Sequence, residues 1–395
     1  MSEPLHYRST RGASHAARIE EVIAAGLAPD GGLYVPEALP QRDPAEFDPN
    51  GSLADTATTL LDPFFRGSSL AGELPAICRE ALDFDVPLRP LSYRQDASLL
   101  ELFHGPSAAF KDVGARFLAA CFRRLRRNSD VPLTILVATS GDTGAAVAAA
   151  FHRQPGVRVV ILYPDGRVSP RQAHQLGSFD DNVQALRVDG TFDDCQRMVK
   201  AALHDAELQL RVPLSSANSI SLGRLLPQMS YYAHAALAWW REHGAPLNFI
   251  VPTGNLGNAL ACIWVREMGL PVGEIHLACN ANATLSDYFD GSPYAPAPPW
   301  PRWPMPWTWA RPAISSACAG PSPATMSCAC NCMPAAWMTK PFAKPSCATR
   351  ATTTKCSVRI RRRPCTCSTT WASPACRGRW CRRPIRRNST AWSSP

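Results

Sequence analysis

The chain has 395 residues, of which 41 are Lys or Arg and 32 are Asp or Glu, giving a formal charge of +9. The basic excess comes from residues 291–395, which contain 16 of the Lys and Arg residues but neither Asp nor Glu. Residues 1–290 are therefore acidic, and the overall charge does not indicate that this body binds nucleic acid.

The opening region, residues 1–85, is rich in small residues and shows no obvious catalytic group. A helix is predicted at residues 16–25. The turn sequence Pro29-Asp30-Gly31-Gly32 then precedes the short apolar run Leu33-Tyr34-Val35.

From about residue 97 the pattern alternates between strands and helices. Continuous apolar strands that alternate with helices are typical of a mostly parallel sheet covered on both faces, so an α/β fold is predicted. The predicted strands cover residues 98–103, 133–138, 157–163, 183–188, 248–251 and 274–278. The predicted helices cover residues 114–127, 144–152, 195–205, 222–242 and 258–268.

Lys111 is the first residue in this region whose setting suggests chemistry. It follows Ala108-Ala109-Phe110 and the turn Gly105-Pro106. The plain interpretation is a solvated surface lysine, as most lysines are. Apolar neighbours indicate partial burial instead, which would lower the pKa of the amine and make it a better imine-forming nucleophile.

Two glycine-bearing loops each follow a predicted strand and precede a predicted helix. The first contains Ser140, Asp142 and Thr143, whose side chains offer two hydroxyls and a carboxylate that can cap the helix. The second is Gly254-Asn255-Leu256-Gly257-Asn258. Glycine lets the backbone approach closely, so N–H groups at a helix start can converge on a phosphate.

The second loop fits neither GxGxxG nor GxxxxGK[ST], so sites for dinucleotides and nucleoside triphosphates are poorly supported. Each loop alone could be a structural turn or helix cap. A partly buried lysine followed by two anion-binding turns is, however, the set of groups that an enzyme needs to hold pyridoxal phosphate.

Residues 291–395 have an unusual composition. They hold 10 of the 15 Cys and 8 of the 11 Trp residues but little periodicity, which fits neither a core nor a solvated tail. The genetic code allows a frameshift to be tested. When the third base of each codon from Pro298 to Ala310 is read together with the first two bases of the next codon, the shifted frame encodes a helix-forming sequence that ends in Gly. We therefore expect an aberrant, non-native tail. The alternative is a genuine Cys/Trp/Arg-rich domain.

Four segments, residues 103–112, 138–146, 216–226 and 254–258, together carry a family resemblance. In this order they resemble the bacterial type of threonine synthase, a family of fold-type II pyridoxal-phosphate enzymes related to the tryptophan synthase β-subunit. Residues 7–12 and 26–36 look like the N-terminal domain of that family. In the same shifted frame, one of the sequences that the codons for Lys355 to Thr369 can encode contains the Pro-His-Thr stretch that lies near the cofactor ring in the family.

The resemblance implies two parallel-sheet αβα subdomains with pyridoxal 5′-phosphate between them, preceded by an N-terminal domain. It divides the chain into residues 1–85 (N-terminal domain), 86–290 (an incomplete catalytic core) and 291–395 (the tail). By the same analogy Lys111 holds the cofactor as an imine, and Ser140 and Asp142 lie near its ring. The residues that would cradle its phosphate are Gly254, Asn255, Leu256, Gly257 and Asn258. The residues that would bind the substrate, O-phospho-L-homoserine, are Ser107, Thr143, Asn218, Ser219 and Arg224.

Two alternatives remain open at this point. One is another fold-type II lyase, such as a serine/threonine dehydratase or a cysteine synthase, which would share Lys111 and the second glycine loop. The other is a nucleic-acid-binding protein driven by the arginines between Arg359 and Arg387, with binding that depends on salt and on the tail.

The cysteines and the hydropathy pattern limit the setting of the protein. The five cysteines before residue 291 are scattered, which favours free thiols over disulfides or a zinc site, so no metal is expected. No apolar run approaches the roughly 20 residues that span a bilayer. We therefore predict a cytoplasmic monomer or homodimer with a small-molecule substrate, no nucleic-acid partner and no membrane contact. If the tail is out of frame, this particular chain is expected to be impaired.

Overall fold

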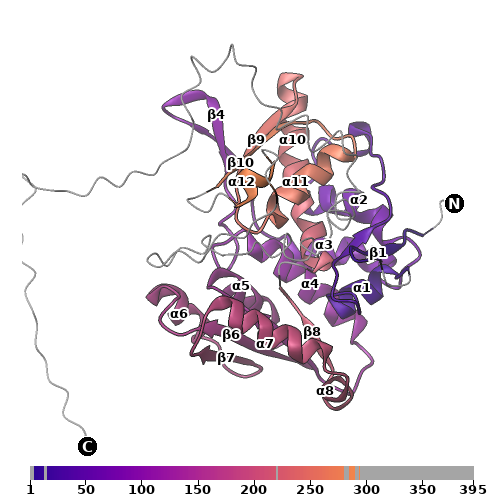
Figure 1. The fold of residues 1–395 in the computed structure, drawn as a ribbon. Coiled ribbons are helices and arrows are strands. Elements are labelled where there is room, and N and C mark those ends of the chain that lie inside the picture. The colour runs from indigo at the N-terminus through magenta and orange to yellow at the C-terminus, as the bar shows by residue number, and fades with distance from the viewer. Residues whose placement is uncertain (1–3, 13–15, 219–220, 280–283, 290–292, 294–395) are drawn as a thin grey trace, which may run out of the picture. The chain divides into compact units, whose positions relative to one another are not determined.

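The computed structural model describes residues 4–12, 16–218, 221–279, 284–289 and 293 (Figure 1). The tail from residue 294 onward and Ser219 lie outside the described residues, and so do the predictions made for them.

The N-terminal region combines a two-stranded sheet with helices. Strands β1 (Tyr7–Ser9) and β2 (Tyr34–Pro36) pair antiparallel, with Tyr7 opposite Pro36. Helix α1 (Ile19–Ala25) agrees with the predicted helix, and Ile19, Val22 and Ile23 form its buried face. The sequence patterns missed α2 (Leu53–Phe65) and α3 (Leu74–Ala81), which pack against each other.

Four parallel strands form the main sheet, in the order β7-β6-β5-β8. Their bounds are Leu133–Ala138 for β5, Val157–Pro164 for β6, Val183–Val188 for β7 and Leu214–Ser216 for β8. The α/β architecture with a parallel sheet, predicted from the alternating pattern, is therefore confirmed.

Alternate residues of β5 and β6 face opposite sides of this sheet, as strand geometry requires. Ile135 and Ile161 belong to the main hydrophobic core. Ala138 and Leu162 pack instead with Cys195 and Val199 of α7 (Phe192–His204) in a smaller cluster. Helix α7 lies along one face of the sheet (Figure 1).

The helix that precedes β5 and the helix that connects β5 to β6 both carry candidate site residues. Helix α4 (Lys111–Leu125) packs against α5 (Asp142–Phe151), and α5 packs against α6 (Pro170–Leu176). The short α8 (Ala206–Arg211) follows α7.

A second parallel sheet consists, among the described residues, of β9 (Leu247–Pro252) and β10 (Val272–Ala278). Helix α11 (Gly257–Glu267) connects the two strands and packs against α10 (Met229–His243). Ile250, near the middle of β9, is 71% exposed.

Two predicted elements were wrong in their extent. The predicted strand 98–103 belongs to β4 (Arg94–Leu100), which forms an antiparallel hairpin with β3 (Leu88–Leu91) and is separate from the parallel sheets. The local sequence pattern of a strand does not reveal which other strand it pairs with. The predicted helix 222–242 is broken into α9 (Leu222–Leu225), the 3₁₀ turn η3 (Leu226–Gln228) and α10. Pro227 explains this break, because its ring removes a backbone donor and disfavours a continuous helix.

The last helix among the described residues is α12 (Thr284–Phe289). None of the described helices combines the length and the apolar character that crossing a membrane requires. Cys78, Cys121, Cys195 and Cys262 are buried free thiols.

Candidate functional site

Lys111 is the first residue of α4 and is largely buried. The preceding loop bends at Ala108, whose φ of 54° lies in the left-handed region. The lysine side chain is 15% exposed, its Nζ lies 3.5 Å from Asp142 Oδ2, and it lies 4.2 Å from the centre of the Phe110 ring. Burial lowers the pKa of the amine. Asp142 partly opposes that shift, and Arg224 reinforces it.

The loop between β5 and α5 brings Asp142 to this amine. The hydroxyl of Thr139 accepts hydrogen bonds from the backbone N–H groups of Gly141 and Gly144, at 3.0 and 2.8 Å. Gly141 has a φ of 139°, which L side chains rarely adopt. This tight turn starts α5 with Asp142 as its first residue, so Asp142 lies beyond the carboxyl end of β5, where α/β proteins bind ligands.

The loop between β9 and α11 forms the other wall. Leu256 has a φ of 61°, and Gly257 begins the helix. A non-glycine residue in the left-handed region carries strain that the surroundings must offset, and such positions cluster at functional sites. The backbone N–H groups at the start of α11 and the helix dipole favour an anion here.

Asn258, in the first turn of α11, is held by aromatic hydroxyls. The Tyr232 hydroxyl donates to Asn258 Oδ1, and Asn258 Nδ2 donates to the Tyr231 hydroxyl and, at 3.2 Å, to Gln228 Oε1. Gln228 Nε2 in turn donates to the Arg224 carbonyl at 2.8 Å. These bonds connect the second glycine loop to α10 and to the broken helix segment.

Arg224 supplies a buried cation. It is 1% exposed, and its Nη1 donates to the Ala217 carbonyl at 2.7 Å. Burial lowers its pKa to about 10, with Asp112 acting in the opposite direction. Its position depends on Gly114 of α4, because a Cβ at Gly114 would lie 2.7 Å from the Arg224 carbonyl oxygen. Only glycine lets α9 approach α4 this closely.

One pocket collects most of the residues that the sequence singled out. Of the predicted site residues, Lys111, Ser140, Asp142, Thr143, Arg224, Gly254, Asn255, Leu256, Gly257 and Asn258 line it. Ser107 and Asn218 do not line it: Ser107 binds Asp112, and the Asn218 backbone N–H donates to Ser216 Oγ. Ser219 lies outside the described residues.

Four lining residues were not predicted as site residues, namely Phe110, Gln228, Pro252 and Thr253. Phe110 directly precedes the predicted lysine, and Thr253 directly precedes the predicted loop. Their position next to predicted site residues is the signal that could have identified them. Gln228 follows Pro227, and the proline that breaks the predicted long helix was its only hint.

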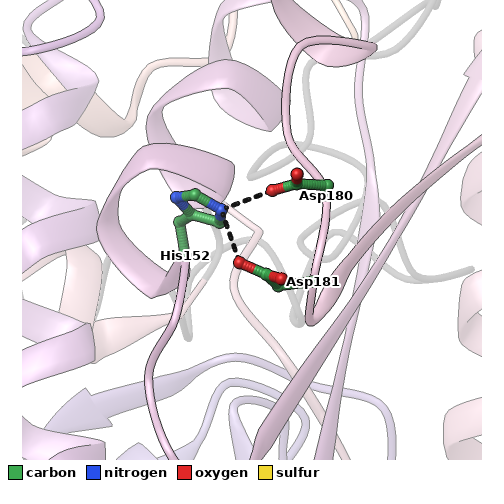
Figure 2. A group of neighbouring side chains, drawn as sticks. All are labelled: His152, Asp180 and Asp181. Atoms are coloured by element: carbon green, nitrogen blue, oxygen red, sulfur yellow. Dashed lines mark hydrogen bonds and ion pairs between the residues drawn. The ribbon is translucent and has the colours of Figure 1, made fainter.

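A different group of side chains could in principle hold a cation. His152 Nε2 lies 3.1 Å from Asp180 Oδ1 and 3.6 Å from Asp181 Oδ2 (Figure 2). Arg153 Nε also donates to Asp181 Oδ2, at 2.6 Å. The partly exposed histidine, the two exposed aspartates and the arginine form an ion-pair cluster that is explained without a metal.

Two family models match the chain. The model of the pyridoxal-phosphate dependent enzymes matches residues 90–315, and the model of the threonine synthase N terminus matches residues 6–82. The pocket described above lies within the first of these segments.

Curated relatives agree with these matches. Threonine synthase of Escherichia coli (strain K12) is 39% identical over 279 residues, which cover 70% of this chain and 64% of that protein. Threonine synthase of Haemophilus influenzae is 37% identical over 276 residues, which cover 70% of this chain and 64% of that protein. The chain thus spans slightly less than two thirds of the length of these relatives.

Solved structures of the same kind of protein superpose on the chain. The crystal structure of threonine synthase from Escherichia coli gives a TM-score of 0.72 at 34% identity and covers 78% of this chain and 71% of that one. The structure of pyridoxal-phosphate-bound threonine synthase from Brucella melitensis gives a TM-score of 0.68 at 36% identity, covering 75% and 65%.

Proposed function

This chain belongs to the threonine synthase family of pyridoxal-phosphate-dependent enzymes, and we propose that it converts O-phospho-L-homoserine and water to L-threonine and inorganic phosphate. The observation that carries the proposal is the buried Lys111 amine, which shares one pocket with Asp142, Arg224 and the start of α11.

The residues of the pocket fit pyridoxal phosphate. A buried amine with a lowered pKa is suited to bind an aldehyde, and the start of α11 is suited to bind a phosphate. Thr253 Oγ1 and Arg224 Nε are buried and lack a hydrogen-bond partner among the described residues. Buried polar groups are normally paired, so these two favour a polar ligand in the pocket.

Lys111 is proposed to hold the cofactor and then to move protons. When bound, pyridoxal phosphate withdraws electrons from the substrate α-carbon and so makes its proton acidic. Lys111 would hold the cofactor through Nζ, and the same Nζ, when it is free, would take the α-proton as a general base. The lowered pKa keeps a larger fraction of this amine unprotonated near neutral pH, and Asp142 orients it from 3.5 Å.

The substrate side of the pocket is proposed to bind a phosphate dianion. Arg224 offers a buried guanidinium, whose fork of donors suits such an anion, and the Ser140 and Thr143 hydroxyls lie at the start of α5. Departure of the phosphate from the γ-carbon would require loss of a β-proton. Protonation of the γ-carbon, addition of the water hydroxyl at the β-carbon and return of a proton to the α-carbon would then complete L-threonine. Ser107, Asn218 and Ser219 remain predicted substrate contacts.

The test is product analysis with the purified protein and added pyridoxal phosphate. Release of inorganic phosphate together with threonine from O-phospho-L-homoserine supports the proposal. Turnover of serine without turnover of this phosphate ester would identify a dehydratase or a cysteine synthase type instead, because those enzymes act on substrates without a γ-phosphate.

We extend the proposal to the organisation and setting of the chain. Residues 1–85 would be the N-terminal domain, 86–290 an incomplete catalytic core and 291–395 an out-of-frame tail that leaves the enzyme impaired. The protein would be cytoplasmic, a monomer or homodimer, with neither nucleic acid nor membrane as a partner. Resequencing of the gene around the codons for Tyr294 to Pro298 tests the frame directly.

A further inference from the structure

We propose that Gln172 is a positioning residue of this pocket, whose side-chain amide holds the Asp142 carboxylate against the Lys111 amine. The inference rests on the proposed function only in taking Lys111 as the reactive amine. Gln172 belongs to α6, thirty residues beyond Asp142 in the sequence, and it does not line the pocket itself.

The contact joins the two oxygens of one carboxylate to two different partners. Gln172 Nε2 donates to Asp142 Oδ1 at 2.7 Å, while Asp142 Oδ2 lies 3.5 Å from Lys111 Nζ. A hydrogen bond to a charged acceptor is among the stronger kinds in proteins. With one oxygen held from behind by Gln172, the other is kept facing the amine.

The orientation of the Gln172 amide follows from the start of α6. Its Oε1 accepts the backbone N–H of Ser169 at 3.2 Å and the Ser169 hydroxyl at 3.1 Å, in a capping box. A backbone N–H can only donate, so the atom that faces it must be the amide oxygen. The amide nitrogen is thereby directed to Asp142, and the capping of α6 and the orientation of Asp142 depend on the same side chain.

The backbone beside this contact is shaped to admit Gln172. A Cβ at Gly141 would lie 2.3 Å from Gln172 Cδ and 2.4 Å from its Nε2. Since real Cβ atoms do not approach this closely, any side chain at position 141 would displace the amide. The contact therefore depends on the absence of a side chain at Gly141, and the φ of 139° at this residue also favours glycine.

The charged groups that act on Lys111 come from three elements. Asp142 of α5 and Asp112 of α4 raise its pKa, while Arg224 of α9 and the burial of the amine lower it. Asp142 is the first and larger of the two carboxylate contributions. If Gln172 no longer holds Asp142, the carboxylate can turn towards solvent, and the pKa of Lys111 should fall further.

The test measures the protonation of Lys111 in the full chain without cofactor. Competitive labelling with acetic anhydride over a pH series, read by mass spectrometry of the peptide that contains Lys111, gives a titration midpoint, with exposed Lys200 of α7 as internal reference. We expect Gln172→Met to move the midpoint to lower pH by part of the shift that Asp142→Asn produces. The double variant should match Asp142→Asn alone, because coupled residues are not additive.

Ser169→Ala is the matched control, since it removes the capping hydroxyl but keeps the backbone N–H that orients Gln172. It should leave the Lys111 midpoint unchanged. If Gln172→Met does not fold, Gln172→Asn replaces it with the same expectation, because its amide is one methylene too short to reach both partners.

Full additivity of the two substitutions, or a midpoint that stays in place with Gln172→Met, would overturn the positioning role. Failure of the proposed function looks different. In that case the double variant still matches Asp142→Asn alone, but borohydride traps no pyridoxal phosphate on Lys111.

Discussion

Asp112 binds Ser107 with both of its carboxylate oxygens. Oδ2 accepts the Ser107 backbone N–H at 2.9 Å, and Oδ1 accepts its hydroxyl at 2.7 Å. Asp112 is 1% exposed, and a Cβ at Gly105 would lie 2.6 Å from its Oδ2. The residue directly after Lys111 therefore fixes the loop directly before it.

We predict that Asp112→Asn destabilises the fold as well as the pocket. The amide keeps the shape of the carboxylate but offers only one acceptor oxygen for two Ser107 donors, so the loss should be about 1–3 kcal/mol in the free energy of unfolding. Urea denaturation measures this value. Exposed Asp85 provides the control, since Asp85→Asn should change stability by less than about 0.5 kcal/mol. Equal effects of the two substitutions would contradict the role given to Asp112.

Lys111→Ala should abolish covalent cofactor binding. Removing the only amine proposed to bind the aldehyde and move the α-proton should lower phosphate release by roughly 10²- to 10⁴-fold. Borohydride trapping followed by peptide mass spectrometry checks the attachment. Lys200→Ala, at an exposed position on α7, should retain both trapping and turnover. Trapping on the Lys111→Ala variant would show that another residue holds the cofactor.

Tyr232→Phe should weaken cofactor binding without unfolding the protein. The Tyr232 hydroxyl donates to Asn258 Oδ1 at the start of α11, and its ring stays packed against Phe249 without it. Loss of one such hydrogen bond is worth about 1 kcal/mol, or roughly a fivefold increase in Kd for pyridoxal phosphate. Fluorescence titration of the apoprotein measures the change. Tyr93→Phe, at a tyrosine that is 78% exposed, should give the wild-type Kd.

Acid should destabilise the protein through His234. Its Nδ1 lies 2.9 Å from Thr56 Oγ1, a bond that joins α10 to α2, and burial followed by the charge of Arg241 lowers its pKa below 6.5. The unfolded chain then binds more protons than the folded one, so this contribution to stability is complete above pH 6.5 and is lost as the pH falls to the folded pKa. The stability of wild type should drop more between pH 7.5 and 5.5 than that of His234→Gln, measured by urea denaturation.

A chain translated in the second reading frame after about residue 293 should expose less apolar surface. Ile250 is 71% exposed in the middle of β9, although parallel strands are normally covered on both faces. The frame-corrected protein should bind less of the dye ANS and show higher specific activity than the present chain. Comparable activity of the two proteins would refute the impairment.

The sequence predicted the parts of the molecule that depend on local patterns. The strands at residues 133–138 and 183–188 have the predicted bounds, and both glycine loops lie at the ends of strands as expected. The hydrophobic runs and turn residues that define them are contiguous in the chain. For the same reason the burial of Lys111 could be predicted from its immediate neighbours.

Contacts between distant residues could not be predicted in this way. The amide of Gln172 reaches Asp142 where α6 packs on α5, and Gln228 meets Asn258 across thirty residues of sequence. Neither glutamine has a distinctive neighbourhood in the sequence. Helices α2 and α3 were missed although their apolar residues have helical spacing, as Leu74, Ile77, Cys78 and Ala81 of α3 do.

The two glycine loops belong to different sheets, since one follows β5 and the other follows β9. A ligand that contacts both loops therefore connects two separate sheets. Ligand binding should therefore be detectable away from the reacting groups. We expect slower amide hydrogen exchange in β9 and greater resistance to proteases, even with a ligand that does not react.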